Sequence, residues 1–566
     1  MIQQSGLALR TLRTPAFVLA ICLAVVPLSA QQVAAPAPQS APSSQGSPPA
    51  QVPDKAPDTS AAAPGHHITA EQARQLFGLV DQLIQFSSQE TGFPIRGEVN
   101  RRLTTRAAVA SYLMAKLDDD QDAKRMQQSE IVLKKFGLLD RDFNLKPFLI
   151  DLLKEQIEAY YDPKTKTVNL LDWVAPDEQK PVLAHELTHA LQDQHINLDK
   201  WDEQTPVDVS LNSSDDNIHL AKDEIDAARG AVIEGQATAV MMDNILKPMG
   251  HSRLKDPEVV EFIKRKMAAS SDSPVMARAP ILLSESLMFP YRDGLSFVQD
   301  IWMDKGRDAA FTGTLDHPPT STWEIINPLR YEQGMTPPIP LLPDIHPLAD
   351  KLYRPYDIGQ VGQLDVKILC HILGGDQAAR DFASAWDGGL YWAGQRRDAT
   401  PSERATTGSI ALFYLSMWTN PTSAQDFARL YARNLGRKYS NLKRDEAAEK
   451  STPAGVDEEV YSTGEGPVVI TTRGKMVFIA ESFPLSLARN LASLILDFQG
   501  SGAIETARGR FTPANPPAVV FASDPQPLTA SFVRFFARAG VMKSAVDAAL
   551  QARASLVEAA PGARRQ

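Results

Sequence analysis

The sequence predicts an α+β fold in which helices predominate. Stretches with apolar residues three and four positions apart indicate amphipathic helices, chiefly over residues 69–136, 145–160, 220–246 and 256–306. Short runs of β-branched and aromatic residues indicate strands, the clearest at 167–171, 409–414, 467–471 and 475–480. The length of 566 residues is enough for two or three domains.

The N-terminal segment predicts export. Residues 1–30 contain a basic stretch, an apolar run and small residues ending at Ala30, a pattern typical of a secretory signal peptide cleaved near that residue. An uncleaved anchor is the alternative, although the apolar run is short for a membrane span. We therefore expect an exported protein, periplasmic or secreted, whose mature chain has no membrane-spanning segment.

Composition divides the remaining chain into four segments. Residues 31–65, rich in Pro, Ala and Ser, predict a disordered linker, and residues 66–436 form the main region. A polar linker is expected at 437–465, followed by a C-terminal α+β extension at 466–566. The hairpin predicted within this extension either completes the main sheet or belongs to a small separate unit, and residues 501–566 look peripheral.

Charge and cysteine content narrow the functional classes. Loss of residues 1–30, which hold two Arg and no acidic residue, changes the net charge from −10 to about −12. An acidic exported protein is a poor candidate for binding nucleic acid. Cys22 leaves with the signal peptide, so Cys370 has no intrachain disulfide partner and is expected to be a buried, small apolar residue.

Residues 185–189 read His-Glu-Leu-Thr-His. On a helix, His185 and His189 lie one turn apart on the same face, so both can bind one metal ion, usually zinc. Glu186 then stands where its carboxylate can take a proton from a metal-bound water. Pro181 fits the first turn of this helix. The alternative is an amphipathic helix in which the two histidines only pack or hydrogen-bond.

A catalytic zinc site needs a third protein ligand, and Glu234 is the best candidate. It falls in the least charged part of the predicted helix 220–246, where an unpaired carboxylate is costly to bury. The adjacent Gly235 indicates close approach by another backbone. A solvated helix residue or a buried salt bridge is the other interpretation of Glu234.

Other residues compete for the third position. His195 and His219 are the rival ligands, although His195 lies on a different side of the helix from His189 or just beyond its end. The acidic residues Asp223, Glu224 and Asp226 are weaker candidates, since their cluster looks solvated.

The segment from His185 to Asp193 resembles the zinc helix of the gluzincins, the thermolysin-like metallopeptidases. The resemblance implies a zincin-like catalytic core with an active-site helix and a short mixed sheet. It implies one Zn²⁺ per chain held by His185, His189 and Glu234, with Glu186 as general base. Asp193 would orient His189 from behind.

This sequence departs from the gluzincin pattern at two points. Gluzincins often carry an acidic residue one turn after the glutamate ligand, and Thr238 occupies that place here. The separation between His189 and Glu234 is also longer, because the polar stretch 199–219 looks like an inserted loop.

A second resemblance covers residues 75–435. The segments 139–145, 158–163, 234–237 and 319–322, together with the zinc helix, are similar to a family of bacterial exported proteins with few characterised members. Its members are usually described only provisionally as metallopeptidases, so this similarity implies a fold more than a substrate.

The expected function is zinc-dependent hydrolysis of a peptide or protein substrate. Tyr291 and His317 are candidates for stabilising the oxyanion, and each is otherwise a packing or loop residue. The strand at 167–171 is either the edge of the cleft, where a peptide could pair, or an ordinary core strand. The alternative function is a catalytically weak binding or scaffold protein of the cell envelope on a gluzincin fold.

Overall fold

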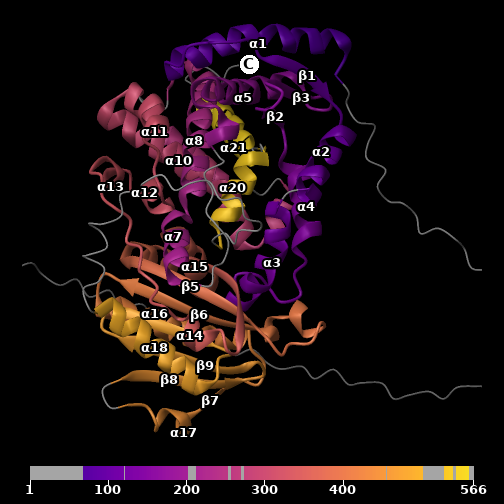
Figure 1. Ribbon diagram of the computed structural model, residues 1–566. Coiled ribbons are helices and arrows are strands. Elements are labelled where there is room, and N and C mark those ends of the chain that lie inside the picture. Colours follow the sequence, from indigo (N-terminus) through magenta and orange to yellow (C-terminus); the bar gives the residue numbers. More distant parts are fainter. Residues whose placement is uncertain are drawn as a thin grey trace, which may run out of the picture. The chain divides into compact units, whose positions relative to one another are not determined.

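A computed structural model describes residues 68–119, 121–201, 212–252, 257–268, 273–453, 456–500, 528–539 and 543–559. This part of the chain is α+β and predominantly helical, as predicted (Figure 1). The predicted signal peptide and the Pro/Ala/Ser-rich linker lie outside the described residues. Among the described helices, none is both long and apolar enough to cross a bilayer.

The first helices precede and flank a small sheet. They are α1 (Ala70–Thr91), α2 (Arg106–Asp119), α3 (Gln121–Phe136) and α4 (Leu145–Gln156). The sheet contains β1 (Asn100–Thr104), β2 (Ala159–Asp162) and β3 (Thr167–Leu171), in the order β1-β3-β2. β1 runs parallel to β3, and β2 runs antiparallel to it. β3 is central and fully buried, so residues 167–171 form a core strand and not the edge of a cleft.

A group of helices follows this sheet. It contains α5 (Pro176–Ile196), α6 (Leu198–Trp201), α7 (Ser213–Lys222), α8 (Ile225–Leu246), α9 (Pro257–Ala268) and α10 (Ile281–Lys305). α8 packs against both α5 and α10. The helix predicted at 220–246 is divided, because α7 ends at Lys222 and α8 begins at Ile225.

Two prolines lie inside helices. α5 begins at Pro176, so Pro181 is an internal residue and not part of the first turn. α10 continues through Pro290, which lies within the helix predicted at 256–306. A proline costs the helix one hydrogen bond, but Phe289 and Tyr291 beside it are fully buried, and this tertiary packing sustains the helix.

Two glycines allow α8 and α10 to cross at close range. A Cβ on Gly235 would overlap the backbone carbonyl of Gly294, and a Cβ on Gly294 would overlap the carbonyl oxygen of Ala231. The close backbone approach predicted at Gly235 is confirmed. Because Glu234 precedes this glycine, the crossing fixes the depth at which its carboxylate lies.

A seven-stranded antiparallel sheet makes up much of the later chain. Its strands are β4 (Tyr353–Gln360), β5 (Trp386–Arg396), β6 (Ile410–Trp418), β7 (Lys443–Arg444), β8 (Asp457–Thr463), β9 (Gly466–Arg473) and β10 (Met476–Glu481). Their order is β4-β5-β6-β10-β9-β8-β7. The predicted hairpin, β9–β10, therefore completes a sheet with β4–β6. The expected linker 437–465 contains β7 and β8 of this sheet.

Short helices connect α10 to the sheet, and longer ones cover it. The segment after α10 is rich in Pro and contains α11 (Thr314–Asp316), α12 (Thr322–Ile326), α13 (Pro328–Glu332) and α14 (His346–Ala349). The others are α15 (Gln363–Ala385), α16 (Pro421–Asn434), α17 (Glu446–Glu449) and α18 (Leu485–Gly500). Along β10, Val477 packs in the same core cluster as α16, and Phe478 packs in the cluster of α18. Since strand residues alternate between faces, α16 and α18 cover opposite faces. Cys370 of α15 is buried, as predicted.

The C-terminal helices belong to the core. α20 (Ala530–Ala539) packs against α8 and α10, and α21 (Lys543–Ala559) packs against α9 and α8. Phe532 and Phe536 of α20 are fully buried. The expectation that residues 501–566 are peripheral is therefore wrong for these two helices.

Candidate metal centre

Helices α5 and α8 bring three potential metal ligands together. Nε2 of His185 lies 3.0 Å from Oε2 of Glu234, and Nε2 of His189 lies 3.5 Å from the same oxygen. One ligand atom from each residue lies within 4.8 Å of both others. Among the described residues this is the one such group of His, Cys, Asp and Glu side chains. The predicted trio therefore forms a buried cluster able to hold a metal ion.

The pKa shifts of the three side chains indicate which of them carries a charge. Burial alone would raise the pKa of Glu234, but the two imidazoles outweigh burial and lower this pKa to about 2. Burial also opposes charge on His189, yet the carboxylate of Glu234 raises the pKa of His189 to about 9. Burial lowers the pKa of His185 to about 4. The buried carboxylate is thus ionised, and a proton or a metal ion must balance it.

Glu186 lies beside the cluster with spare hydrogen-bonding capacity. Its Oε1 is buried and has no hydrogen-bond partner among the described residues. Burial raises the pKa of Glu186 to about 7, although the charge of His189 and the backbone N–H of Tyr161 on β2 both act to lower it. A buried carboxyl that gains and loses a proton near neutrality is suited to proton transfer.

Asp193 does not have the role predicted for it. Its Oδ2 accepts hydrogen bonds from the Tyr161 hydroxyl and the Lys166 ammonium, both at 2.7 Å, so the carboxylate is directed toward the β2–β3 hairpin. Nδ1 of His189 instead lies 2.8 Å from Oε1 of Gln192. The partner behind this histidine is an amide three residues along the helix and not the carboxylate four residues along it.

The rival third ligands lie in other interactions. His195 contacts Asp316 at 3.2 Å and stacks on Phe93, and His219 contacts Asp223 at 3.3 Å. Neither joins His185 and His189 in a ligand group among the described residues.

The acidic residues between α7 and α8 are not solvated as expected. Asp223, Glu224 and Asp226 are all buried, because this connection packs against the later chain. Asp223 accepts a hydrogen bond from the backbone N–H of Gln360, and Glu224 accepts one from the hydroxyl of Thr322. Asp223 thereby links the α7–α8 connection to β4, and Glu224 links it to α12.

The two predicted oxyanion residues have different positions. The Tyr291 ring centre is 6.2 Å from that of His185, so this tyrosine lies at the cluster. His317 is exposed in the turn after α11, where its carbonyl accepts a hydrogen bond from Tyr331. Tyr112 of α2, which no sequence signal singles out, stacks on Tyr160. Burial raises the pKa of Tyr112, and the carboxylates of Asp162 and Glu186 add to this shift.

The two histidines differ in the hydrogen bonds made by their Nδ1 atoms. Nδ1 of His185 has no hydrogen-bond partner among the described residues. Thr238, at the place where gluzincins often carry an acidic residue, is buried, and its hydroxyl is likewise without a hydrogen-bond partner in the described chain. Among these two imidazoles, Nδ1 is held only in His189.

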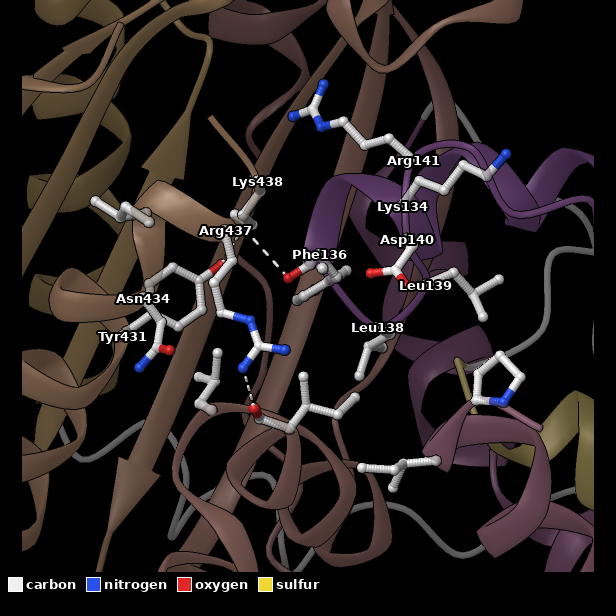
Figure 2. A pocket seen from close by; sticks show the side chains of 16 residues that line it. Lys134, Phe136, Leu138, Leu139, Asp140, Arg141, Tyr431, Asn434, Arg437 and Lys438 are labelled. Carbon is white, nitrogen blue, oxygen red and sulfur yellow. Dashed lines mark hydrogen bonds between the residues drawn. The ribbon is translucent and has the colours of Figure 1, made fainter. Parts of the chain in front are cut away.

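A pocket of about 200 Å³ lies away from this cluster (Figure 2). Its lining includes Lys134, Asp140, Arg141, Arg437 and Lys438, and none of the metal-cluster residues. Figure 2 shows Lys438 hydrogen-bonded to the carbonyl of Phe136, and the guanidinium of Arg437 donates to the carbonyl of Ile372. These cations join the α3–α4 turn to the region around α15 and α16.

Comparison of the chain with family models, curated proteins and solved structures finds no match.

Proposed function

We propose that the chain is an exported zinc metallopeptidase of the gluzincin type, with a zincin-like core that hydrolyses peptide bonds. The observation that carries the proposal is the convergence of three ligand atoms, from His185, His189 and Glu234, beside the unpartnered carboxylate oxygen of Glu186. Two imidazoles and one carboxylate are a donor set that catalytic zinc uses. The fit is supported by the burial of an ionised carboxylate whose charge a bound metal ion can balance.

Each group then has a definite task. Bound zinc would supply Lewis-acid chemistry, which makes water more acidic and polarises a carbonyl. Glu186 takes a proton from the attacking water and passes it to the leaving nitrogen, since its pKa of about 7 allows both steps. Tyr291 remains a candidate for stabilising the oxyanion, because it lies beside His185.

Substrate access requires movement of the segments over the site. The side chains of His185, His189 and Glu234 are exposed by only 1, 10 and 2 %. Tyr112 of α2 lies close enough to Glu186 for the two side chains to interact electrostatically. The same burial also favours the alternative, a metal-bound scaffold protein of the cell envelope with little turnover.

Hydrolysis of a mixture of unstructured peptides by the zinc-loaded chain tests the proposal. We expect Glu186→Gln to reduce the rate by about 10²–10⁴-fold, because general-base catalysis is lost, while zinc content is unchanged. Glu71→Gln, on the exposed face of α1, is the matched control and should be fully active. Equal rates in the Glu186 variant and the parent would contradict the mechanism. A zinc-loaded parent that cleaves nothing would favour the scaffold alternative.

A further inference from the structure

We propose that Gln192 and Gln236 form a relay of two amides that holds His189 in the tautomer needed for binding a metal through Nε2. The inference rests on the proposed metal site and adds two positioning residues to it. Both glutamines are fully buried, with no exposed surface. Their hydrogen bonds run from the imidazole of His189 on α5 to the chain that follows α10.

The orientation of the Gln192 amide follows from its neighbours. Its Nε2 lies 3.0 Å from the carbonyl oxygen of Ile233 and 2.9 Å from Oε1 of Gln236. A backbone carbonyl can only accept, so the NH₂ group of Gln192 must face Ile233. The oxygen of the same amide must then face Nδ1 of His189, which is 2.8 Å away.

This orientation selects one tautomer of His189. An amide oxygen only accepts hydrogen bonds, so Nδ1 must carry the hydrogen and donate it. A metal binds only the neutral imidazole, which has a single N–H, so with that hydrogen on Nδ1 the lone pair is on Nε2. Nε2 is the atom that faces Glu234 at 3.5 Å, on the side where a metal would be bound.

Gln236 fixes Gln192 in turn. Its Nε2 lies 3.1 and 2.9 Å from the carbonyl oxygens of Ala310 and Phe311, and 2.9 Å from the hydroxyl oxygen of Thr314. The two carbonyls lie in η3 (Ala309–Gly313), a π-helical turn just before α11, and they can only accept. The oxygen of the Gln236 amide must therefore face Gln192.

Reversal of either amide would leave buried groups unpaired. A turned Gln192 would place its oxygen against the Ile233 carbonyl and its NH₂ group against the Nδ1 hydrogen. Each such mismatch leaves a buried polar group without a hydrogen bond, so the relay has one stable direction. The sequence alone gives no sign of it, because Gln192 and Asp193 are both about one helical turn beyond His189.

The test is zinc affinity, measured by competition with a chromophoric chelator, in variants of the full chain. Gln192→Met keeps the length of the side chain and removes the acceptor, and we expect its affinity to fall about 10–100-fold. In Gln192→Glu, one carboxylate oxygen can still accept the hydrogen of Nδ1. The other carboxylate oxygen faces the Ile233 carbonyl, which also only accepts. It should keep zinc affinity within about threefold of the parent and lower thermal stability. Asp193→Asn is the neighbouring control and should bind zinc like the parent, because Asp193 contacts the β2–β3 hairpin.

A second readout separates positioning from general destabilisation. Cobalt(II) in place of zinc gives visible absorption that depends on its ligand geometry. We expect Gln192→Met to change this spectrum and Asp193→Asn to leave it as in the parent. If Gln192→Met does not fold, Gln236→Met serves instead, with a smaller loss of affinity because Gln192 keeps its bond to Ile233.

The outcomes distinguish this inference from the proposed function. A folded parent that binds no zinc would overturn the proposed metal site itself. A parent that binds zinc, with a Gln192→Met variant that binds it equally well and gives the same cobalt spectrum, would overturn the relay alone. A fall in affinity for Gln192→Met with none for Gln192→Glu and Asp193→Asn would support it.

Discussion

Two buried clusters of charged side chains neutralise their carboxylates in different ways. Between α3 and the seven-stranded sheet, Lys135 pairs with Glu465 at 2.8 Å and Lys438 pairs with Glu481 at 2.6 Å. Each carboxylate there has an ammonium of its own. In the metal cluster, the ion-pair partners of Glu234 among the described residues are two imidazoles.

The two clusters differ in the kind of group that neutralises the carboxylate. Burial lowers the pKa of Lys135 and of Lys438, but the partner carboxylates act against that shift, and each Lys–Glu pair needs no added ion. An imidazole is neutral or charged according to its surroundings, so Glu234 depends on a proton or an added cation. A lysine is enough to neutralise a carboxylate that serves only stability. This chain uses lysine in that way at Glu465 and Glu481. This contrast supports the proposed metal site.

The largest expected effect comes from breaking the structural network. Lys438→Met should lower the free energy of unfolding by about 3–5 kcal/mol, because Glu481 keeps its buried charge without a cation. Denaturant unfolding measures this change. Zinc content should be the same as in the parent. The double variant Lys438→Met with Glu481→Gln should recover part of the loss, and no recovery would show that the unpaired charge is not the cause.

The next prediction concerns the crossing that holds Glu234 in place. Gly235→Ala should destabilise the chain by about 3 kcal/mol and reduce zinc affinity, because its Cβ would overlap the Gly294 backbone and separate α8 from α10. Gly78→Ala is the matched control, since nothing lies within 4 Å of a Cβ there. It should stabilise α1 by about 0.5–1 kcal/mol. A Gly235 variant as stable as the parent in thermal unfolding would contradict the tight crossing.

A third group of carboxylates, without lysine or arginine among their described interactions, holds protons instead. Burial, reinforced by the charge of Asp223, raises the pKa of Asp357 to about 8. Burial and the charge of Glu224 raise the pKa of Asp365 to about 7. An unfolded aspartate titrates near about 3.9, so these two groups favour the folded state most below that pH. Their contribution is lost as the pH rises through the folded pKa values.

The smallest expected effect, taken over a single pH unit, is a dependence of stability on pH. Each group contributes a slope of up to about 1.4 kcal/mol per pH unit, and urea unfolding between about pH 5 and about pH 8 should show stability falling. Asp357→Asn should flatten this slope. Glu465 acts in the opposite direction, since Lys135 outweighs its burial and lowers its pKa to about 2, and its contribution is lost only in acid. An unchanged slope in the Asp357 variant would show that Asp357 does not contribute to the pH dependence of stability.

The parts of the site that could be predicted from sequence are those set by local geometry. His185 and His189 are placed on one face by helical spacing alone, and Glu234 stands out as a lone carboxylate in an apolar helix. The role of Asp193 could not be predicted in the same way. Helical spacing brings both Asp193 and Gln192 near His189. The distant Tyr161 and Lys166 direct the carboxylate of Asp193 away from the histidine.

Contacts between distant parts of the chain also explain why parts of the fold differ from the prediction. β1 has mostly exposed polar residues, and it is a strand because it pairs with β3 from a distant part of the chain. α20 and α21 carry no motif, yet they cover α8 and complete its burial. The hairpin β9–β10 was predictable because its pairing is local.

The most direct measurement is the zinc content per chain, by elemental analysis, of the mature protein and of its Glu234→Ala variant. The account predicts about one zinc in the parent and a clear loss in a variant that remains folded. Equal zinc in both would remove Glu234 from the site. A well-folded parent without zinc would contradict the central claim that the buried cluster is a zinc centre.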